Sequence, residues 1–328
     1  MIAGSTVLQW SPPMLDLDEP LSYLRTLRDY VRWSASRFRE AGLVFGHGTD
    51  NALDEAAALV LHSVHLPPVI DDDLWQARVT PSEGRAILER AKRRIDERLP
   101  LPYLTREAWF AGLPFYVDNR VLVPRSPIAE LIETGFAPWL DPDRVERVLD
   151  MGTGSGCIAI ACALAFDHAV VDASDVSEEA LEVARINVQR HQLQDWVRLH
   201  RADAFDGLPR GECYELIVAN PPYVDAGDMA QLPPEYRHEP RLGLAAGDDG
   251  LDVVRRILAE AHHWLAEDGL LVVEVGNSAE AVEALWPQAP VVWIEFERGG
   301  HGVFAMTAQD LRACEGLFGA PAPHQHNQ

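Results

Sequence analysis

"VLDMGTGSGCIAI", residues Val148–Ile160, joins a strand-like apolar run to a helix-like run of small residues through a turn with three glycines. In a doubly wound sheet, the turn after the first strand lies at the carboxyl edge, where ligands bind. Glycines let a ligand approach the backbone N–H groups of such a turn closely. The stretch therefore predicts a cofactor-binding loop. Its candidate cofactor-binding residues are Asp150, Gly152, Thr153, Gly154, Ser155 and Gly156.

The chain around this loop alternates strand-like and helix-like segments from Ser126-Pro127 onward. Strand-like runs end near Asp175, Asp203 and Asn220, with helical runs of about 10 to 15 residues between such strands, as in βαβ units of a parallel sheet. The last two runs, "VVWIEF" and "GVFAMT", have no helix between them, which predicts an antiparallel hairpin at the end of the sheet. The fold class is therefore α/β, with a Rossmann-like, seven-stranded sheet in residues 125–312.

The first hundred residues are predicted to be helical. "EPLSYLRTLRDYVRWSASRF", residues 19–38, repeats apolar side chains at steps of three and four, which predicts one amphipathic helix. A second helix is expected after Asp50-Asn51. A third is expected at Thr80-Pro81, where Glu83 completes a capping box. Residues 1–105 should therefore form a small helical bundle.

Two further segments flank the predicted sheet domain. Residues 106–124 hold two β-rich runs around Gly112, followed by the turn pair Asp118-Asn119, which predicts a hairpin-like linker. Residues 313–328 lack hydrophobic periodicity, and we expect them to be a disordered tail.

The ends of the second and third predicted strands supply further candidates for cofactor binding. Asp175 lies where an acidic side chain accepts hydrogen bonds from both hydroxyls of a ribose. Asp172 competes for this role, but Asp175 is nearer the end of its strand. Asp203 is placed to bind an adenine amino group, with the Ala204 N–H and the Phe205 ring nearby.

The glycine spacing separates two classes of cofactor. The dinucleotide pattern G-x-G-x-x-G needs a third glycine where this chain has Cys157, so NAD is the disfavoured alternative. The loop and the acidic end of the next strand together resemble the class I S-adenosylmethionine-dependent methyltransferase fold. That resemblance implies S-adenosylmethionine as the cofactor.

The fourth predicted strand ends in "NPPY", Asn220 to Tyr223, which are the candidate catalytic residues. A planar amide or base amine is a poor nucleophile because its nitrogen lone pair is delocalised. The Asn220 side-chain oxygen and the Pro221 carbonyl can accept both hydrogens of such an NH2 group and aim its lone pair at a methyl donor. Pro221 and Pro222 fix the backbone and remove N–H donors. Tyr223 offers a ring to the planar group or to a cationic sulfonium. An ordinary proline-rich turn is the alternative.

Several blocks of the chain resemble the HemK-type protein glutamine methyltransferases. They are "PRSPIAELIE" (124–133), "LDMGTGSGCIAIA", "DVSEEALEVARIN", "NPPY", "HEPRLGLAAGDDGLD" (238–252) and "GLLVVEVG". The resemblance implies methylation of a glutamine side-chain amide in a protein that the N-terminal helical domain holds. "GHGTDNALDEAAALVLHSVHLPP" (46–68) looks like the branch that modifies ribosomal protein L-three. The release-factor branch typically has "PRPDTE" where this chain has "PRSPIAE" (124–130), so L-three is the expected partner and a release factor the alternative.

The resemblance also implies roles for individual positions. Gly152 to Gly156 would wrap the methionine part of the donor, Asp175 its ribose, and Asp203 with Ala204 its adenine. Asn220, which borders the donor, would hold the glutamine amide together with its neighbours up to Tyr223. Three further roles stay open in the sequence. Arg125 either steadies the donor carboxylate or is structural. Glu239 and Asp249 are candidates to line the pocket, and the alternative for Asp249, together with Asp248, is to cap the helix that begins near Leu251.

The charge of the chain favours a basic partner. The net charge is -23, with 12 Lys and Arg against 15 Asp and Glu in residues 1–105, and 16 against 36 in the remainder. An acidic field repels nucleic acid phosphates and attracts basic proteins such as ribosomal proteins before or during ribosome assembly. Direct nucleic-acid binding is therefore not expected.

Two rival functions remain open. An amino methyltransferase acting on nucleic acid would use a basic stripe, for which residues 85–98 supply Arg85, Arg90, Lys92, Arg93, Arg94 and Arg98, although acidic residues interrupt them. A non-catalytic assembly factor would bind the donor only as a ligand, which an intact "NPPY" disfavours.

The composition also limits where the protein is expected in the cell, and it disfavours disulfide and metal sites. The longest uncharged apolar run, Cys157–Phe166, is far shorter than the roughly 20 residues of a membrane span. Residues 1–14 have no Lys or Arg before their apolar patch, which disfavours a secretory signal. A cytoplasmic protein is expected. Four cysteines without a CxxC pair indicate buried thiols rather than disulfides or a metal site.

Overall fold

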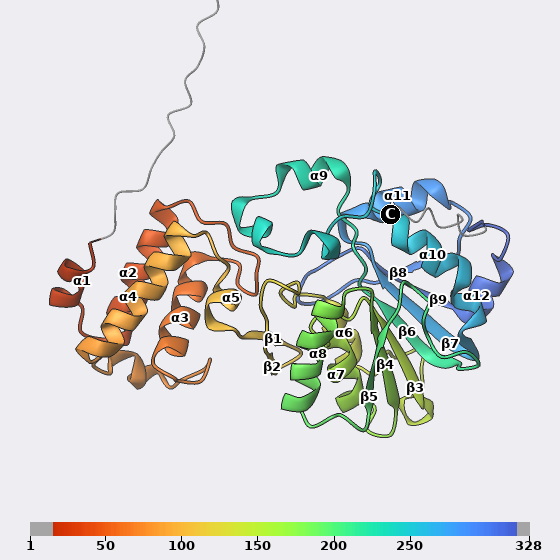
Figure 1. The fold of residues 1–328 in the computed structure, drawn as a ribbon, viewed down its shortest axis with the longest axis horizontal. Helices are drawn as coiled ribbons and strands as arrows, with labels where there is room; N and C mark the ends of the chain where they lie inside the picture. The colour runs from red at the N-terminus through yellow and green to blue at the C-terminus, as the bar shows by residue number, and fades with distance from the viewer. Residues whose placement is uncertain (1–15, 320–328) are drawn as a thin grey trace, which may run out of the picture. The chain divides into compact units, whose positions relative to one another are not determined.

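The computed structural model describes residues 16–319 (Figure 1). Residues 1–14, where no signal peptide is expected, and residues 320–328 of the predicted tail lie outside the described residues. The chain divides into two compact units, Met1–Thr105 and Arg106–Gln328. Each unit has its own hydrophobic core, so each is described by itself.

The first unit is helical, as the apolar spacing predicts. Its helices are α1 Asp18–Tyr23, α2 Leu27–Glu40, α3 Ala52–Ser63, the 3-10 helix η1 Asp72–Gln76, α4 Pro81–Asp96 and α5 Leu101–Thr105. Two predicted helix starts are confirmed. Asn51 accepts backbone N–H hydrogen bonds at the start of α3, and Thr80 forms a capping box with Glu83 at the start of α4. The helices meet in one core that contains Phe38 and Leu59.

Residues 19–38 form two helices, so the prediction of a single helix was wrong. The Thr26 hydroxyl accepts from the Asp29 N–H, and the Asp29 carboxylate accepts from the N–H groups of Thr26 and Arg25. This capping box starts α2 at Leu27 and leaves α1 as a separate helix. Thr26 also pairs with Arg78 in an isolated β-bridge. The apolar side chains keep the same spacing across the break, because this spacing does not depend on where a helix is capped.

The second unit contains a twisted sheet of seven strands in the order β5-β4-β3-β6-β7-β9-β8. The strands are β3 Arg147–Met151, β4 Val170–Asp175, β5 Val197–Arg201, β6 Tyr214–Ala219, β7 Leu265–Glu274, β8 Val292–Trp293 and β9 Val303–Thr307. Strands β3 to β7 pair in parallel, whereas β9 is antiparallel to both β7 and β8. The predicted sheet and its antiparallel end are therefore confirmed.

Helices cover both faces of this sheet (Figure 1). They are α6 Ile128–Glu133, α7 Cys157–Ala165, α8 Glu178–Arg190, α9 Ala226–Gln231, α10 Asp252–Glu260, α11 Ala279–Leu285 and α12 Ala308–Ala313, with 3-10 helices η2 Pro142–Arg144, η3 Pro234–His238, η4 Arg241–Gly243, η5 Ala261–His263 and η6 Gly276–Ser278. Val148 belongs to the core under α6, α7 and α8, and Leu149 to the core under α10, α11 and α12. Successive strand residues point to opposite faces, which is why the central strands β3, β6 and β7 bury apolar side chains on both faces.

The strand order reverses at β3, which has β4 on one side and β6 on the other. In open α/β sheets this switch point places the ligand crevice at the carboxyl ends of the strands. The loops after β3, β4 and β6 all lead from that edge.

Residues 106–124 contain a short hairpin of β1 Ala108–Phe110 and β2 Leu113–Phe115. Ala108 pairs with Phe115 and Phe110 with Leu113, so the turn falls at residues 111–112. This is the type of element predicted for the linker.

The tail prediction needs a correction between residues 313 and 319. Phe318 is only 8 % exposed, and its ring meets Trp286 edge-on at 5.5 Å. Leu317 also packs on the core beneath α12, because two adjacent apolar side chains suffice to anchor a short segment there. Two cysteines also depart from the expectation of burial, since Cys213 is exposed and Cys314 is only partly buried. Across residues 16–319, no helix is long and apolar enough to cross a membrane.

Candidate active site

The loop after β3 has an unusual backbone. Gly152, Gly154 and Gly156 have φ of 72°, 53° and 81°. A Cβ on Gly152 would lie 3.5 Å from the backbone oxygen of Asn220, so the first loop touches the start of the loop after β6. A Cβ on Gly154 would meet only the Gly152 oxygen at 4.0 Å, which leaves open space beside Gly154. The predicted cofactor loop and the predicted catalytic motif are therefore neighbours.

Asp150, near the end of β3, anchors this loop through hydrogen bonds. Its Oδ2 accepts from the Thr153 hydroxyl at 2.6 Å, within the loop, and from the Ala159 N–H at 3.0 Å, in the first turn of α7. Its Oδ1 has no hydrogen-bond partner among the described residues. Complete burial raises the pKa of Asp150 to about 7. The predicted cofactor-binding aspartate thus holds the loop that would hold the cofactor.

The geometry favours Asp175 over Asp172 at the end of β4. Asp175 Oδ2 accepts from the Gly154 N–H and Oδ1 from the Ser177 N–H, both at 2.9 Å. Each oxygen keeps a lone pair for a further donor such as a ribose hydroxyl. Burial raises the pKa of the Asp175 carboxyl, so added donors would favour its ionised form. Asp172 is instead buried against Arg147 at 2.6 Å and His200 at 2.7 Å.

The segment after β5 differs in part from its predicted role. The Asp203 carboxylate is half exposed and binds Arg256 at 2.5 Å, an arginine that sequence reasoning missed. Ala204 has a φ of 51°. The Phe205 ring is 3 % exposed and stacks on Trp264 with centroids 5.4 Å apart. Phe205 therefore belongs to the hydrophobic core and its ring is withdrawn as a ligand contact, because an aromatic ring gains more from apolar burial than from a half-exposed edge.

Asn220 follows the last residue of β6, next to β3 in the sheet. It is half-buried, and within residues 16–319 its carboxamide makes no hydrogen bond. Pro221 is buried and Pro222 half-buried directly after it. A polar side chain at a ligand edge without a protein partner is suited to an external one.

Tyr223 is fixed at three points. Its hydroxyl donates to Glu274 at 3.2 Å, and its carbonyl accepts from the Ser278 hydroxyl at 2.9 Å. A Cβ on Gly276 would lie 2.6 Å from the ring, so ring and backbone are in direct contact. Burial, followed by the adjacent Glu274 charge, raises the pKa of the Tyr223 hydroxyl. The hydroxyl is thus an anchor rather than an acid, and the ring remains as a wall.

The open roles of Arg125 and Glu239 resolve as a structural pair. Arg125 Nη1 and Nη2 bind the two Glu239 oxygens at 2.5 and 2.9 Å, and Glu239 also accepts from the Val123 N–H at 3.1 Å. The guanidinium lies over the Tyr236 ring at 5.5 Å. A buried carboxylate needs a paired cation, so Arg125 is committed to Glu239 and is withdrawn as a ligand of the donor carboxylate.

Asp249 does not take the capping role left open for it, because the start of α10 has no side-chain cap. Its Oδ1 accepts from the Leu251 N–H at 3.2 Å, in the turn before α10, and its carboxylate pairs with Arg255. Asp249 therefore stabilises that turn rather than the first N–H groups of the helix.

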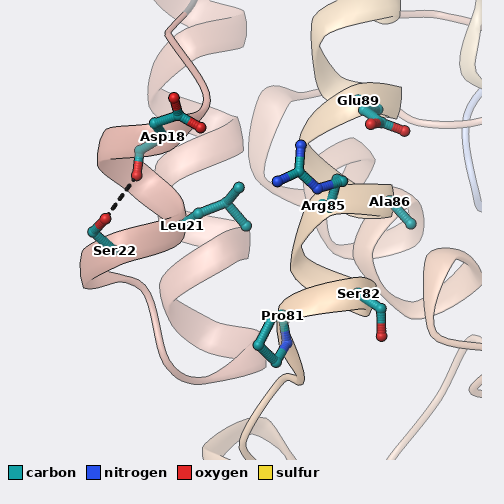
Figure 2. Close-up of a pocket in the computed structure, with 8 residues that line it drawn as sticks. All are labelled: Asp18, Leu21, Ser22, Pro81, Ser82, Arg85, Ala86 and Glu89. Atoms are coloured by element: carbon teal, nitrogen blue, oxygen red, sulfur yellow. Dashed lines mark hydrogen bonds between the residues drawn. The ribbon is translucent and has the colours of Figure 1, made fainter.

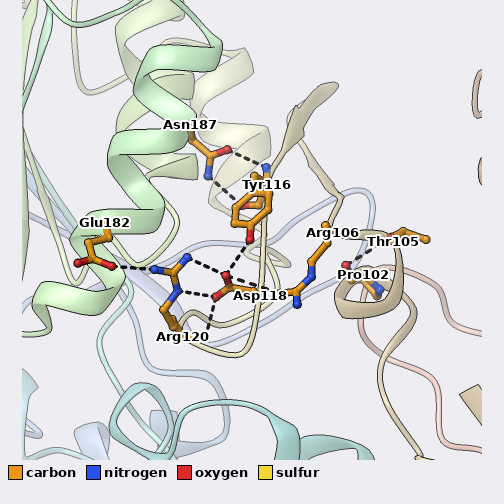
Figure 3. Close-up of polar contacts among 8 residues, drawn as sticks. All are labelled: Pro102, Thr105, Arg106, Tyr116, Asp118, Arg120, Glu182 and Asn187. Carbon is orange, nitrogen blue, oxygen red and sulfur yellow. Dashed lines mark hydrogen bonds and ion pairs between the residues drawn. The ribbon is translucent and has the colours of Figure 1, made fainter. Parts of the chain in front are cut away.

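Hydrogen bonds that the sequence did not reveal join the linker to α8 (Figure 3), and one more joins α8 to the first loop. The fully buried Asn187 of α8 accepts from the Tyr116 N–H at 2.7 Å and donates to the Tyr116 carbonyl at 2.9 Å and the Ser155 carbonyl at 2.8 Å. Farther along, Arg120 bridges Asp118 and Glu182. The carboxamide thus uses both of its donors, one of them on the glycine loop.

The helical unit has a groove between α1 and α4, about 640 Å³ in volume (Figure 2). Its lining includes Asp18, Leu21, Arg85 and Glu89. None of the predicted site residues lines it.

The sheet order, the glycine loop and the Asn-Pro-Pro-Tyr turn define a class I methyltransferase. Residues 135–232 match the family described as "Methyltransferase small domain". A "Ribosomal protein uL3 glutamine methyltransferase" of Bordetella pertussis is 52 % identical over 289 residues, covering 88 % of this chain and 97 % of the relative. Proteins with the same name from Burkholderia pseudomallei and Francisella tularensis are 50 % and 46 % identical, covering 89 % and 91 % of this chain and 97 % and 95 % of the relatives. This chain belongs to the ribosomal protein uL3 glutamine methyltransferase family.

Proposed function

We propose that this chain transfers a methyl group from S-adenosylmethionine to the side-chain amide nitrogen of a glutamine in ribosomal protein L-three. The observation that carries the proposal is the close approach of two loops. The backbone oxygen of Asn220 would lie 3.5 Å from a Cβ on Gly152. Any ligand on the glycine loop is therefore next to the motif that can hold an amide.

The residues at the carboxyl edge fit the proposed donor. The open space beside Gly154 admits a ligand to the backbone, and Asp175 has free lone pairs for ribose hydroxyls. Asp203 and Ala204 follow at the next strand end and would hold the adenine, with the Asp203 carboxylate shared with Arg256. The Asp175 carboxylate at this edge favours a cationic ligand nearby.

The donor supplies a methyl group on a cationic sulfur. The chain supplies orientation: the Asn220 oxygen and the Pro221 carbonyl accept the two hydrogens of the glutamine amide, which aims the nitrogen lone pair. The two prolines hold these acceptors in place without competing N–H groups. Tyr223 closes one side with its ring while Glu274 holds its hydroxyl. Positioning is therefore expected to contribute more to the rate than proton abstraction.

The charge pattern supports a protein substrate over nucleic acid. In the basic stripe of α4, Arg94 is buried on Glu55 at 2.7 Å, Lys92 pairs with Asp96, and Arg93 pairs with Glu97 at 2.8 Å; Arg98 donates to the carbonyls of Ala41 and Gly42. Most of the stripe is thus neutralised inside the helical unit and offers little to a phosphate backbone. The acidic remainder of the chain complements a basic ribosomal protein.

The names of the relatives support L-three over a release factor, and the helical unit is proposed to receive the protein before or during ribosome assembly. A substrate made in the cytoplasm places the enzyme there as well.

The test offers labelled donor to purified, unassembled L-three, to release factors and to ribosomal RNA, followed by peptide mass mapping. Label on one glutamine of L-three is the expected result. Label only on a release factor or on RNA would overturn the substrate assignment. No label on any of them, with donor binding intact, would support the non-catalytic alternative.

A further inference from the structure

Glu274 is a carboxylate at a place where the sheet is otherwise apolar. It is the last residue of β7, which pairs with β6 on one side and β9 on the other, and it is 5 % exposed. A buried carboxylate costs free energy unless it is hydrogen-bonded. The hydrogen-bond partners of Glu274 therefore indicate why a carboxylate is buried at this position.

Both oxygens of Glu274 are acceptors for fixed hydroxyl groups. Oε1 accepts from Tyr223 at 3.2 Å, and Oε2 accepts from Ser126 at 2.5 Å. The Ser126 oxygen itself accepts from the Ile128 N–H at 3.1 Å, at the start of α6. The Ser126 hydroxyl therefore donates to Glu274 while its oxygen accepts from Ile128. The ionised carboxylate is the stronger acceptor for both hydroxyl groups and has no hydrogen of its own that competes with theirs.

The segment that begins at Glu274 contacts Tyr223 at its hydroxyl, its ring and its carbonyl. Glu274 takes the hydroxyl, Gly276 lies against the ring, and Ser278 donates to the carbonyl. Gly276 has a φ of 46°, and a Cβ there would lie 2.6 Å from the ring. A side chain at Gly250 would also collide with the Tyr223 carbonyl, 2.4 Å away. The last residue of the Asn-Pro-Pro-Tyr turn is thus held from β7.

We propose that Glu274 is a positioning residue for amide methylation, whose ionised carboxylate fixes Tyr223 beside Asn220 and whose protonation releases it. The inference rests on the proposed function and deepens it. The end of β7 would then contribute to the reaction through Tyr223, although Glu274 itself would not contact the glutamine or the donor.

The surroundings make this carboxylate responsive to pH. Burial raises the pKa of Glu274 to about 6, against the opposing hydrogen bonds from Ser126 and Tyr223 and the charge of Arg125. Arg125 is already paired with Glu239 and lies over Tyr236. When Glu274 takes a proton, one oxygen gains a hydrogen that competes with the hydrogen of the hydroxyl group donating to it.

The activity test compares Glu274→Gln, Ser126→Ala and the parent over pH 5 to 9. The parent should lose kcat below about pH 6, whereas Glu274→Gln should have about tenfold lower kcat without that acid limb and with KM values within about twofold. Ser126→Ala removes one stabilising donor, so its acid limb should move to higher pH by roughly half a unit or more. A Glu274→Gln variant with the parental kcat and acid limb, or an unmoved limb in Ser126→Ala, would overturn the proposal.

A matched control separates positioning from general destabilisation. Asp172→Asn removes another fully buried carboxylate of the same sheet, held by Arg147, His200 and Tyr214. It should lower thermal stability but leave the acid limb in place. A limb that moved equally in this control would remove Glu274 from the explanation.

A second readout does not depend on methyl transfer. NMR titration should show the Glu274 carboxyl carbon and the Tyr223 ring signals shifting with one midpoint in the parent. The Tyr223 shift should vanish in Glu274→Gln, and persistence of the shift would overturn the positioning role. If the parent methylates no glutamine yet the coupled titration is present, the proposed function fails while the Glu274–Tyr223 coupling stands.

Discussion

The loops after β3 and β6 touch each other, yet they have opposite backbone chemistry. The first has glycines at 152, 154 and 156, all with positive φ, whereas the second has two consecutive prolines at 221 and 222. Glycine permits the left-handed backbone and close approach of a ligand, while proline restricts φ and removes an N–H donor. The difference indicates that the first loop is shaped for access and the second for rigid presentation of two oxygen acceptors.

The strongest test of this contrast removes one acceptor from the rigid loop. Asn220→Ala should lower kcat about 1,000-fold, because an unoriented amide is a poor nucleophile, while donor affinity stays within about threefold. Single-turnover kinetics and calorimetry measure the two quantities. Asn119→Ala, an exposed asparagine of the linker, is the matched control and should behave as the parent. Unchanged single-turnover methylation in Asn220→Ala would remove Asn220 from catalysis.

A second test addresses Asp150, which anchors the glycine loop. Burial raises the pKa of Asp150 to about 7, well above that of an unfolded aspartate, so its stabilising contribution is present at low pH and is lost as pH rises through about 7. Asp150→Asn abolishes this titration. The free energy of unfolding of the variant minus that of the parent should therefore rise by about 4 kcal/mol from pH 4 to pH 8.

Urea denaturation at both pH values measures this difference. The control is Asp172→Asn, since hydrogen bonds from His200 and Arg147 outweigh burial and lower the pKa of Asp172. There the parent gains stability as pH rises through the acidic range, so the sign is opposite. A difference that stayed constant for Asp150→Asn would contradict a titrating anchor.

A third test adds one methyl group to the glycine loop after β3. Gly152→Ala must place a side chain at a φ of 72°, beside Asn220, and should weaken donor binding about tenfold. Gly211→Ala introduces similar backbone strain at a φ of 87° in open space, and donor affinity should be unchanged. Calorimetric titration with S-adenosylhomocysteine is the measurement. Equal losses in both variants would mean that strain alone, rather than the site, is responsible.

The smallest expected effect concerns how the glycine loop after β3 is held from outside. Asn187→Ala removes the hydrogen bond to the Ser155 carbonyl together with two bonds to Tyr116, and donor affinity should fall about threefold. Glu182→Ala releases the linker only at Arg120 and should leave donor affinity unchanged. The same calorimetric titration compares them. Parallel losses would locate the effect in the linker instead of the loop.

Local patterns predicted most of the fold correctly. The apolar runs gave the boundaries of β3 and the antiparallel end of the sheet, and Thr80 with Glu83 marked the start of α4. The same reasoning failed at Thr26, where an apolar stripe runs through a capping box. Hydrophobic period and capping are independent signals, and the second decides where a helix breaks.

The candidate site was predicted unevenly for a related reason. Asp175 stands out because a strand end and a glycine loop constrain it locally. Phe205 was assigned to the cofactor and Arg125 was a candidate for it, but each side chain contacts a distant partner instead, Trp264 and Glu239 respectively. No spacing rule connects residues that are far apart in the chain.

By itself, the sequence determined the elements and the chemical groups: alternating strands and helices, a glycine turn, and an asparagine followed by two prolines and a tyrosine. These follow from backbone preference and periodicity, which act over a few residues. Only the tertiary structure decided that Glu274 and Ser126, 148 positions apart, share a hydrogen bond behind Tyr223, and that Asn187 joins the linker to the glycine loop. Burial turns such polar groups into obligatory partners, and burial exists only once the strands have assembled.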